Sequence, residues 1–283
     1  MPELPEVEAV RRELEPVMRG SRFQQVLVRR AGLRTVFPDR FAARLRGRTV
    51  RALTRRGKYL LADLSSGETL LMHLGMSGSF HIERQTASDR VIFRARATRE
   101  ADPHDHVVFR MSSGATVTFN DPRRFGVMDL VPRGVLDEHP ALGAMGPEPL
   151  AVEFDAAALA CACARRKTAL KVALLDQRVV AGLGNIYASE ALHLARLSPR
   201  RRASGIATPS GAPRDSAVRL ASAIKTILQD AIARQTAERY RSSRFRVYDR
   251  EGEPCPTPRC GGTIARFTQA SRSTFYCPVC QTG

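Results

Sequence analysis

The sequence predicts an α+β protein in which an N-terminal antiparallel β-sandwich is followed by a helical domain and a small C-terminal hairpin. Three observations support this. Strand-like patterns recur from residue 23 to residue 131 without intervening helices, which is typical of a sandwich or flattened barrel. Residues 155–240 instead repeat apolar side chains at helical spacing. Four of the six cysteines cluster within the last 30 residues.

The N-terminal half is expected to contain one helix and then strands. The helix should cover residues 5–18, with Pro5 in its first turn, a disturbance near Pro16 and Gly20 after its end. Its core-facing side chains would be Val7, Val10, Leu14 and Val17. Strands are expected at residues 23–28, 59–64, 69–74, 106–111, 115–120 and 127–131, with a hairpin turn at 112–114.

Prolines and glycines mark the boundaries in the rest of the chain. The Pro-bearing stretch 132–149 is expected to be the hinge between domains, and the Pro- and Gly-rich loop 198–214 divides the helical region. We therefore expect domains at residues 1–131, 151–240 and 246–283, with a linker at 132–150.

The chain is strongly basic, with 45 Lys and Arg against 28 Asp and Glu and a formal charge of +17. Polyphosphate is the commonest partner of such a chain, because each neutralised phosphate releases condensed counterions. Arg outnumbers Lys, as in proteins from GC-rich genomes, and a ribosomal-type binder would have a similar charge. The composition therefore favours a nucleic acid partner without establishing it.

The composition also bears on location. Hydrophobic residues make up 43% of the chain, which argues against global disorder. No apolar run approaches the roughly 18 residues of a membrane span, and the acidic N-terminus has no secretory signal. We expect a cytoplasmic protein without membrane association, in which cysteines serve metal binding or packing before disulfides.

The C-terminal cysteines have the spacing of a metal site. Cys255 and Cys260 are separated by four residues, Cys277 and Cys280 by two, and the two pairs by sixteen. Two such pairs can converge on one tetrahedral ion, and the gap between them fits a β-hairpin. Because thiolates are soft ligands, one structural Zn²⁺ is predicted, and the alternative is unrelated cysteines or a disulfide pair.

The remaining two cysteines, Cys161 and Cys163, lie two residues apart in the helical region. Residues at that spacing cannot both face one side of a helix. We interpret them as packing or incidental thiols.

The N-terminus offers an unusual nucleophile. Removal of Met1 would leave Pro2 as a terminal secondary amine, and an α-amino group titrates at about pH 8, so that part of it is neutral. Its attack on a sugar C1′ would give an iminium without an N–H proton, an electron sink suited to β-elimination. Glu3 provides a neighbouring carboxylate for proton transfer. Alone, this segment is more typical of an ordinary acidic helix entry.

Residues 2–8 (Pro-Glu-Leu-Pro-Glu-Val-Glu) resemble the start of the formamidopyrimidine-DNA glycosylase family, and the resemblance continues along the whole chain. Matching stretches occur in family order at residues 57–60, 73–78, 104–107, 120–126, 146–150, 167–171, 182–190 and 272–277. The resemblance implies a helix–two-turn–helix domain and a zinc-finger hairpin, with double-stranded damaged DNA as partner. We also expect a monomer.

The resemblance implies catalytic roles for four residues. Pro2 would be the Schiff-base nucleophile and Glu3 its acid/base partner. Lys58 would contact a phosphate and donate a proton in β-elimination. Arg272 would contact a phosphate and take part in δ-elimination. Glu6 would lie in the pocket for the damaged base.

It also implies the DNA contacts. Three side chains would fill the hole left by a flipped nucleotide: Met76, Arg123 and Phe125. Others would contact phosphates: His104, Arg166, Lys167, Lys171 and Asn185. Gly182 and Gly184 would open a helix whose bare N–H groups approach a phosphate.

The sequence departs from the family in two places. Many relatives have two residues, not four, within the first cysteine pair, a difference that thiolate geometry tolerates. The segment 234–244 is several residues short, lacks glycine and is rich in Arg, where relatives carry a Gly-rich loop over flipped 8-oxoguanine. A lid that closes needs glycine-like freedom. We hypothesise that the loop is truncated or missing and that affinity for 8-oxoguanine falls relative to other lesions.

The leading hypothesis is therefore a bifunctional DNA glycosylase and abasic-site lyase of base excision repair, acting on oxidised or ring-opened purines. One alternative is an endonuclease VIII-like preference for oxidised pyrimidines, favoured by the short segment and opposed by Leu4. Another is a non-catalytic binder of damaged DNA, which would not require Pro2, Glu3 and Lys58.

Overall fold

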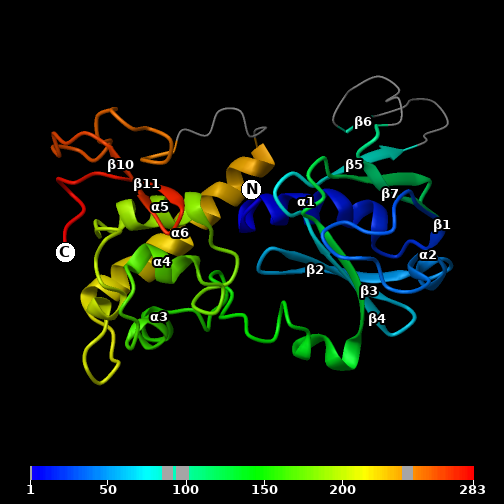
Figure 1. The fold of residues 1–283 in the computed structure, drawn as a ribbon, viewed down its shortest axis with the longest axis horizontal. Coiled ribbons are helices and arrows are strands. Elements are labelled where there is room, and N and C mark those ends of the chain that lie inside the picture. The colour runs from blue at the N-terminus through cyan, green and yellow to red at the C-terminus, as the bar shows by residue number, and fades with distance from the viewer. Residues whose placement is uncertain (1, 85–91, 94–101, 238–244) are drawn as a thin grey trace. The chain divides into compact units, whose positions relative to one another are not determined.

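The computed structural model describes residues 2–84, 92–93, 102–237 and 245–283. The chain forms two compact units, drawn in Figure 1: Pro2 and residues 6–143 make up the first, and residues 3–5 with residues 144–283 the second. Antiparallel sheets occupy the first unit, and the second combines helices with a two-stranded hairpin. The predicted α+β class is confirmed.

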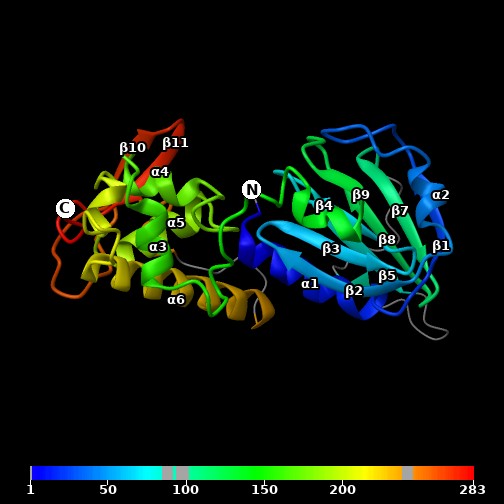
Figure 2. The same ribbon diagram turned by 90° about the horizontal axis from the view of Figure 1, so that it is seen from below.

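The first unit contains one long helix and two antiparallel sheets (Figure 2). The helix is α1 (Leu4–Met18). One sheet has the order β2 (Val50–Arg56), β3 (Tyr59–Leu64), β4 (Glu68–His73), β9 (Val127–Pro132). The other has the order β1 (Phe23–Val28), β7 (Asp105–Met111), β8 (Ala115–Asn120), β5 (Ser79–Arg84), β6 (Ile92–Phe93). Short helices are α2 (Phe41–Leu45) and the 3₁₀ turn η1 (Arg133–Glu138).

Side chains from both sheets share one core, as a sandwich requires. Strand β3 buries every second residue, and Leu60, Ala62 and Leu64 point inward. Phe109 and Phe119 of the other sheet belong to the same cluster. Helix α1 adds Val7, Leu14 and Val17, and Val10, the fourth residue expected on its buried face, packs against the same cluster while partly buried. Pro16 lies inside this helix, which continues to Met18.

All six predicted strands form, with ends shifted by at most one residue. Strands β2, β5 and β6 and helix α2 were not predicted. The register of β2 shifts between Val50 and Ala52, and this bulge breaks the alternation that marks a strand in sequence. Helix α2 has only five residues, too few for a visible period.

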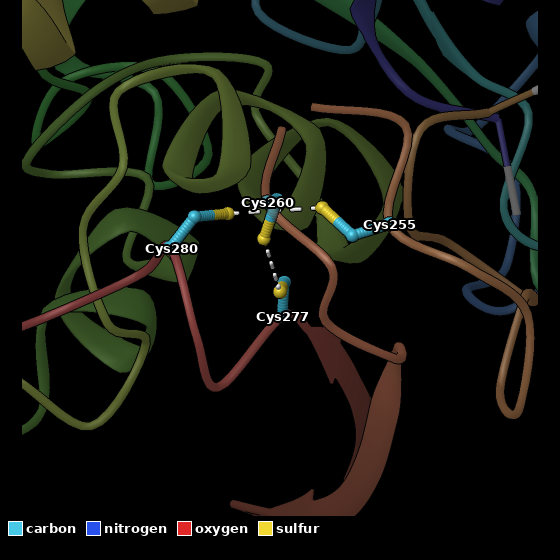
Figure 3. Close-up of side chains that lie close together, drawn as sticks. All are labelled: Cys255, Cys260, Cys277 and Cys280. Carbon is cyan, nitrogen blue, oxygen red and sulfur yellow. Dashed lines mark hydrogen bonds between the residues drawn. The ribbon is translucent and has the colours of Figure 1, made fainter. Parts of the chain in front are cut away.

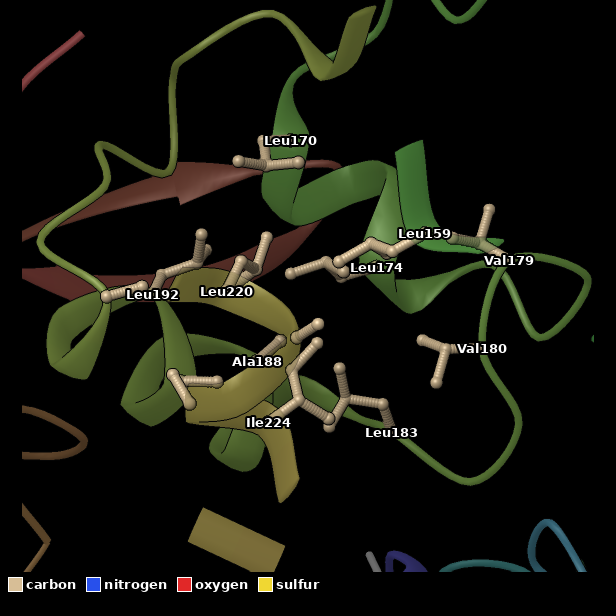
Figure 4. Close-up of a cluster of buried hydrophobic side chains, with 14 of the residues drawn as sticks. Leu159, Leu170, Leu174, Val179, Val180, Leu183, Ala188, Leu192, Leu220 and Ile224 are labelled. Carbon is tan, nitrogen blue, oxygen red and sulfur yellow. The ribbon is translucent and has the colours of Figure 1, made fainter. Parts of the chain in front are cut away.

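The second unit packs its helices around an apolar core (Figure 4). The helices are α3 (Ala156–Cys163), α4 (Leu170–Leu175), α5 (Asn185–Leu194), the 3₁₀ turn η2 (Ala203–Ile206) and α6 (Asp215–Ala237). Leu174, Leu183, Leu192, Leu220 and Ile224 are all fully buried there. None of the helices in the described ranges has both the length and the apolar content needed to cross a membrane.

A hairpin completes the second unit. Its strands, β10 (Ala265–Gln269) and β11 (Arg272–Tyr276), are joined by Ala270 and Ser271, both with positive φ. The segment 234–244, for which we expected a shortened loop, starts within α6. Its residues 238–244 lie outside the described residues, so the expectation about the loop stays a prediction.

Candidate functional site

Glu3 is held by the N-terminus of helix α5. Its carboxylate accepts hydrogen bonds from the backbone N–H groups of Ile186 at 2.9 Å and Tyr187 at 3.3 Å, and the residue is 1% exposed. Unpaired N–H groups in the first helical turn and the helix dipole both favour an anion there. The Glu3 carboxylate is therefore fixed within the second unit and shielded from water.

The two glycines before α5 make this contact possible. A Cβ on Gly184 would lie 2.3 Å from the Glu3 carboxyl carbon, and one on Gly182 would lie 2.7 Å from Leu4 Cδ1. Gly182 also has φ +78°, which favours glycine. We expected these N–H groups to approach a DNA phosphate. Within the described residues the Glu3 carboxylate occupies the N–H groups of Ile186 and Tyr187, and the expected phosphate contact at Gly182 and Gly184 stays a prediction.

Lys58 lies in the two-residue turn between β2 and β3, after Gly57, whose φ is +55°. The lysine is 9% exposed. Next to it, Tyr59 pairs with His73 across the sheet, and their ring centroids are 4.7 Å apart. Burial, assisted by the charges of Lys58 and Arg34, lowers the pKa of His73 to about 4. The neutral imidazole accepts the N–H of Gly75 at its Nδ1, at 2.9 Å.

Asp121 joins the two loops that carry the expected void-filling side chains. It is fully buried, and its carboxylate accepts the Ser77 hydroxyl at 2.5 Å and the Gly126 N–H at 2.8 Å. Ser77 Oγ in turn accepts the N–H of Arg123 at 3.2 Å. The loops are in close contact, since a Cβ on Gly75 would lie 2.3 Å from the carbonyl carbon of Phe125.

Met76, Arg123 and Phe125 project from these loops into solvent. Met76 is 42% exposed and Phe125 is 43% exposed, so both apolar side chains are accessible to a partner. The Arg123 guanidinium lies 4.8 Å from the centre of the Phe125 ring. The structure therefore brings the three residues of the expected triad together, two apolar groups and a cation above a buried support.

The other expected contact residues of the first unit lie at the surface or partly buried. His104 is exposed, and its backbone N–H donates to Asp102 Oδ1 at 2.8 Å. Pro2 and Glu6 are half-buried.

In the second unit, Lys167 is exposed and Arg166 is half-buried. Arg166 donates from Nη1 to Asp176 at 2.8 Å and from Nε to the Ala162 carbonyl at 3.0 Å. Part of its hydrogen-bonding capacity is thus used within the protein.

Lys171 and Asn185 hold the hairpin. Lys171 Nζ donates to Thr274 Oγ1 at 2.8 Å and to the Ser273 carbonyl at 3.2 Å, and Asn185 Nδ2 donates to the same carbonyl at 2.9 Å. Lys171 is 1% exposed, and burial lowers its pKa to about 8, an effect that Glu3 opposes and Arg272 reinforces. Arg272 itself is exposed at the start of β11. A phosphate contact was expected of Lys171, yet its ammonium group is enclosed by protein.

The four C-terminal cysteines converge as predicted (Figure 3). All four Sγ atoms lie within 4.8 Å of one another, with Cys255 and Cys280 3.7 Å apart and Cys260 and Cys277 3.5 Å apart. A tetrahedral Zn²⁺ with bonds of about 2.3 Å holds its sulfur ligands about 3.8 Å apart. The cluster fits one structural zinc ion with a closed set of ligands.

Cys161 and Cys163 take no part in this cluster. Cys163 is fully buried in the helical core, where burial raises its pKa to about 11, and Cys161 is exposed. Both match the interpretation as packing or incidental thiols.

Sequence reasoning did not single out three buried polar residues that organise these sites: Asp121, Glu190 and His193. Asp121 and Glu190 lie within the motifs at residues 120–126 and 182–190, which indicated that these segments are functional but not what the two residues do. Glu190 accepts the backbone N–H groups of residues 246–248 at 2.7 to 2.9 Å, where the chain enters the cysteine module. His193 follows the motif by three residues, and no sequence signal marked it.

Comparisons with known proteins agree with this architecture. Residues 1–128 match the formamidopyrimidine-DNA glycosylase N-terminal domain, residues 145–242 the H2TH domain of the same glycosylase, and residues 252–283 a zinc finger found in FPG and IleRS. A formamidopyrimidine-DNA glycosylase of Bradyrhizobium sp. strain BTAi1 is 56% identical over 292 residues, covering 99% of this chain and 100% of the relative.

Two solved structures are similar over nearly the whole chain. The Lactococcus lactis formamidopyrimidine-DNA glycosylase, non-covalently bound to DNA containing an AP site, has a TM-score of 0.82 and 30% identity, covering 99% of this chain and 100% of that one. The MutM (Fpg) protein of Thermus thermophilus has a TM-score of 0.79 and 36% identity, covering 99% of this chain and 98% of that one.

Proposed function

This chain belongs to the formamidopyrimidine-DNA glycosylase family, and from that membership we propose a bifunctional enzyme of base excision repair. It would excise oxidised or ring-opened purines from double-stranded DNA and then cleave the strand at the abasic site. The single observation that best supports this chemistry is the buried carboxylate of Glu3, the residue after Pro2 in the sequence, which Ile186 and Tyr187 hold by their N–H groups. A binder of damaged DNA has no need of such an arrangement.

In the proposed reaction, removal of Met1 frees the Pro2 amine. The amine attacks C1′ of the damaged nucleotide, the N-glycosidic bond breaks, and the base leaves with the bonding electrons and takes up a proton. The bound amine then gives up its N–H proton, and the C1′–O4′ bond opens, with O4′ taking up a proton, to form a C1′=N⁺ iminium. The resulting iminium has no N–H proton to lose, so it withdraws electrons from the sugar. Loss of a C2′ proton then expels the 3′ phosphate, and a second elimination expels the 5′ phosphate. Glu3 serves as the proton carrier near C1′.

Lys58 and Arg272 are proposed as the cations of the elimination steps. Lys58 sits on a rigid two-residue turn, so it can hold a phosphate or donate a proton at a defined place. Arg272 is exposed at the start of β11 and is oriented by a hairpin that Lys171 and Asn185 fasten through the Ser273 carbonyl. We therefore assign Lys171 and Asn185 a positioning role beside their expected proximity to DNA.

Met76, Arg123 and Phe125 are proposed to fill the space left by the flipped nucleotide. Their exposure and the Arg123–Phe125 contact of 4.8 Å support this, because apolar wedges and a guanidinium can replace an extruded base in the stack. His104, Arg166 and Lys167 are proposed to contact phosphates, and Glu6 to lie near the damaged base.

The lesion range is the part of the proposal that depends on the segment 234–244. The alignment with the Bradyrhizobium protein spans 292 positions against 283 residues here, so this chain carries at least one deletion relative to that relative. We propose that the deletion falls in this segment and that 8-oxoguanine is excised less efficiently than ring-opened purines or oxidised pyrimidines. More efficient excision of 8-oxoguanine than of these other lesions would contradict this proposal.

Borohydride trapping tests the chemistry. The Met-processed protein is mixed with duplexes carrying 8-oxoguanine opposite C, a ring-opened purine, dihydrouracil or an abasic site, and covalent adducts are counted. We expect adducts that disappear in Pro2→Gly and fall at least tenfold in Glu3→Gln. Glu13→Gln, an exposed carboxylate of helix α1, is the matched control and should trap like the unmodified protein.

The outcomes separate the alternatives. Adducts mainly on dihydrouracil would favour the endonuclease VIII-like range on the same scaffold. Absence of adducts on every duplex, with salt-sensitive binding to the abasic duplex intact, would favour a non-catalytic binder.

A further inference from the structure

The imidazole of His193 lies against the cysteine cluster. Its Nε2 is 3.4 Å from Cys255 Sγ, 3.9 Å from Cys280 Sγ and 3.3 Å from Thr257 Oγ1. The residue is 1% exposed and lies in the last turn of helix α5. Four cysteines already complete a tetrahedron, so the imidazole stands outside the set of metal ligands.

The surroundings of the ring decide which nitrogen carries the proton. His193 Nδ1 is buried and has no hydrogen-bond partner among the residues that the structure describes. On the other side, Nε2 faces two sulfurs that are thiolates when a metal is bound, and thiolates only accept hydrogen bonds. A neutral imidazole has one N–H, and placing it at Nε2 satisfies it. We propose that His193 donates this hydrogen bond to the Cys255 thiolate and forms, with Thr257, an outer layer that retains the zinc ion.

Thr257 extends the layer to a second ligand. Its hydroxyl lies 3.7 Å from Cys280 Sγ, near enough to donate to the thiolate, while its carbonyl accepts the N–H of Cys260 at 3.1 Å. Thr257 is one of the four residues between Cys255 and Cys260. This hydrogen-bond donor therefore comes from within the four-residue spacing of the first cysteine pair.

The physical reason for such a layer is charge. Four thiolates around Zn²⁺ leave a net charge of −2 in a partly buried place, and donated hydrogen bonds disperse it. Without them the thiolates are better bases, take up protons more readily and release the metal faster. Outer-layer partners of metal ligands typically change metal affinity about 10- to 100-fold.

Helix α5 connects this layer to the rest of the second unit. Its first turn holds Glu3, its middle holds residues 246–248 through Glu190, and its last turn carries His193. The hydrogen bond to Cys255 therefore fastens the far end of the helix whose near end orients the proposed proton carrier.

The test is the rate at which the zinc-loaded protein gives up zinc to the chromogenic chelator 4-(2-pyridylazo)resorcinol. In His193→Phe, which keeps a ring but removes the N–H, we expect release about 10-fold faster. His193→Gln, whose amide can donate, should recover much of the slow release. His139→Phe, a half-buried histidine of the first unit, is the matched control and should release zinc at the unmodified rate.

A second measurement reads the thiolates directly. In the Co²⁺-substituted protein, loss of the hydrogen bond in His193→Phe should shift the sulfur-to-cobalt charge-transfer bands, while the ligand-field bands stay tetrahedral. Thr257→Val should shift them less and speed zinc release about threefold, a smaller effect since a hydroxyl is a weaker donor.

The outcomes show whether His193 donates a hydrogen bond to the Cys255 thiolate or only packs against the cysteine cluster. Unchanged release and spectra in both His193→Phe and Thr257→Val would overturn the proposal. Equal acceleration in His193→Phe and His193→Gln, with spectra unchanged, would assign His193 to packing and also overturn it. Failure of His193→Phe to retain zinc, while His193→Gln retains it, would support the donor role.

Discussion

The two units present their expected DNA-contacting residues in opposite ways. In the first unit Met76, Arg123 and Phe125 are exposed, and a different residue, the buried Asp121, holds their loops. In the second unit Lys171 is itself buried and, with Asn185, is bound to the hairpin that carries Arg272.

Residues of one family motif can thus have two different roles. A motif residue can contact the substrate, or it can hold the residue that does, and only exposure separates the two. In the first unit the residues expected to contact DNA differ from the residue that holds their loops, so each role can be removed by a separate substitution. In the second unit some residues expected at the DNA provide the support.

The largest effect is expected from removing the support of the first unit. Asp121→Ala leaves the Ser77 hydroxyl and the Gly126 N–H without their buried acceptor, so we expect a loss of about 3 kcal/mol in the free energy of unfolding. Urea unfolding of the whole chain measures it. The control is Asp129→Ala, whose side chain is 38% exposed, with a cost below about 1 kcal/mol. Equal losses of unfolding free energy in Asp121→Ala and Asp129→Ala would show that Asp121 does not hold the two loops together.

Acid should weaken the same loops. The folded pKa of His73 is about 4 and the unfolded value about 6.5, so the unfolded chain binds this proton first. The stability contributed by the neutral ring is complete above pH 6.5 and is lost as pH falls towards 4. Between pH 7 and pH 5 we expect a loss of about 2 kcal/mol relative to His73→Asn, whose amide oxygen can accept the Gly75 N–H without titrating. If the free energy of unfolding depends on pH in the same way for the unmodified protein and for His73→Asn, this expectation is contradicted.

Base should strengthen the second unit. The folded pKa of Lys171 is about 8 against an unfolded value of about 10.5, so burial of its charge opposes folding below pH 8 and is relieved as pH rises towards 10.5. Relative to Lys171→Met, the unmodified protein should gain about 1 kcal/mol between pH 7 and pH 9. Lys167→Met, at an exposed position, is the control and should show no such difference. If the difference in free energy of unfolding between the unmodified protein and Lys171→Met does not change with pH, the Lys171 ammonium group is not desolvated.

The smallest effect on stability is expected from the exposed triad. Met76→Ala and Phe125→Ala should each lower the free energy of unfolding by less than about 1 kcal/mol, because both side chains are 42–43% exposed and their truncation opens no enclosed cavity. Affinity for an abasic-site duplex, measured by fluorescence anisotropy, should nevertheless fall severalfold. Val135→Ala, an equally exposed apolar residue of the first unit, should change neither quantity. A stability loss like that of Asp121→Ala would erase the distinction between contact and support.

Much of the fold was predictable because its signals are local. Helix α1 and the six predicted strands each have their own periodicity, and the cysteine spacing is a geometric requirement of one ion. Strand β2 escaped prediction, since the bulge between Val50 and Ala52 removes the alternation.

Local patterns were enough to predict the order of helix α1 and six strands, the four metal ligands and, through the motifs, the family and the segments that carry function. They gave no sign that Glu3 binds the first turn of α5, that Lys171 is buried, or that His193 reaches Cys255 from 62 residues away. The physical reason is that periodicity and spacing depend on neighbours along the chain. Burial and hydrogen bonding depend on neighbours in space, which distant segments supply when the chain folds.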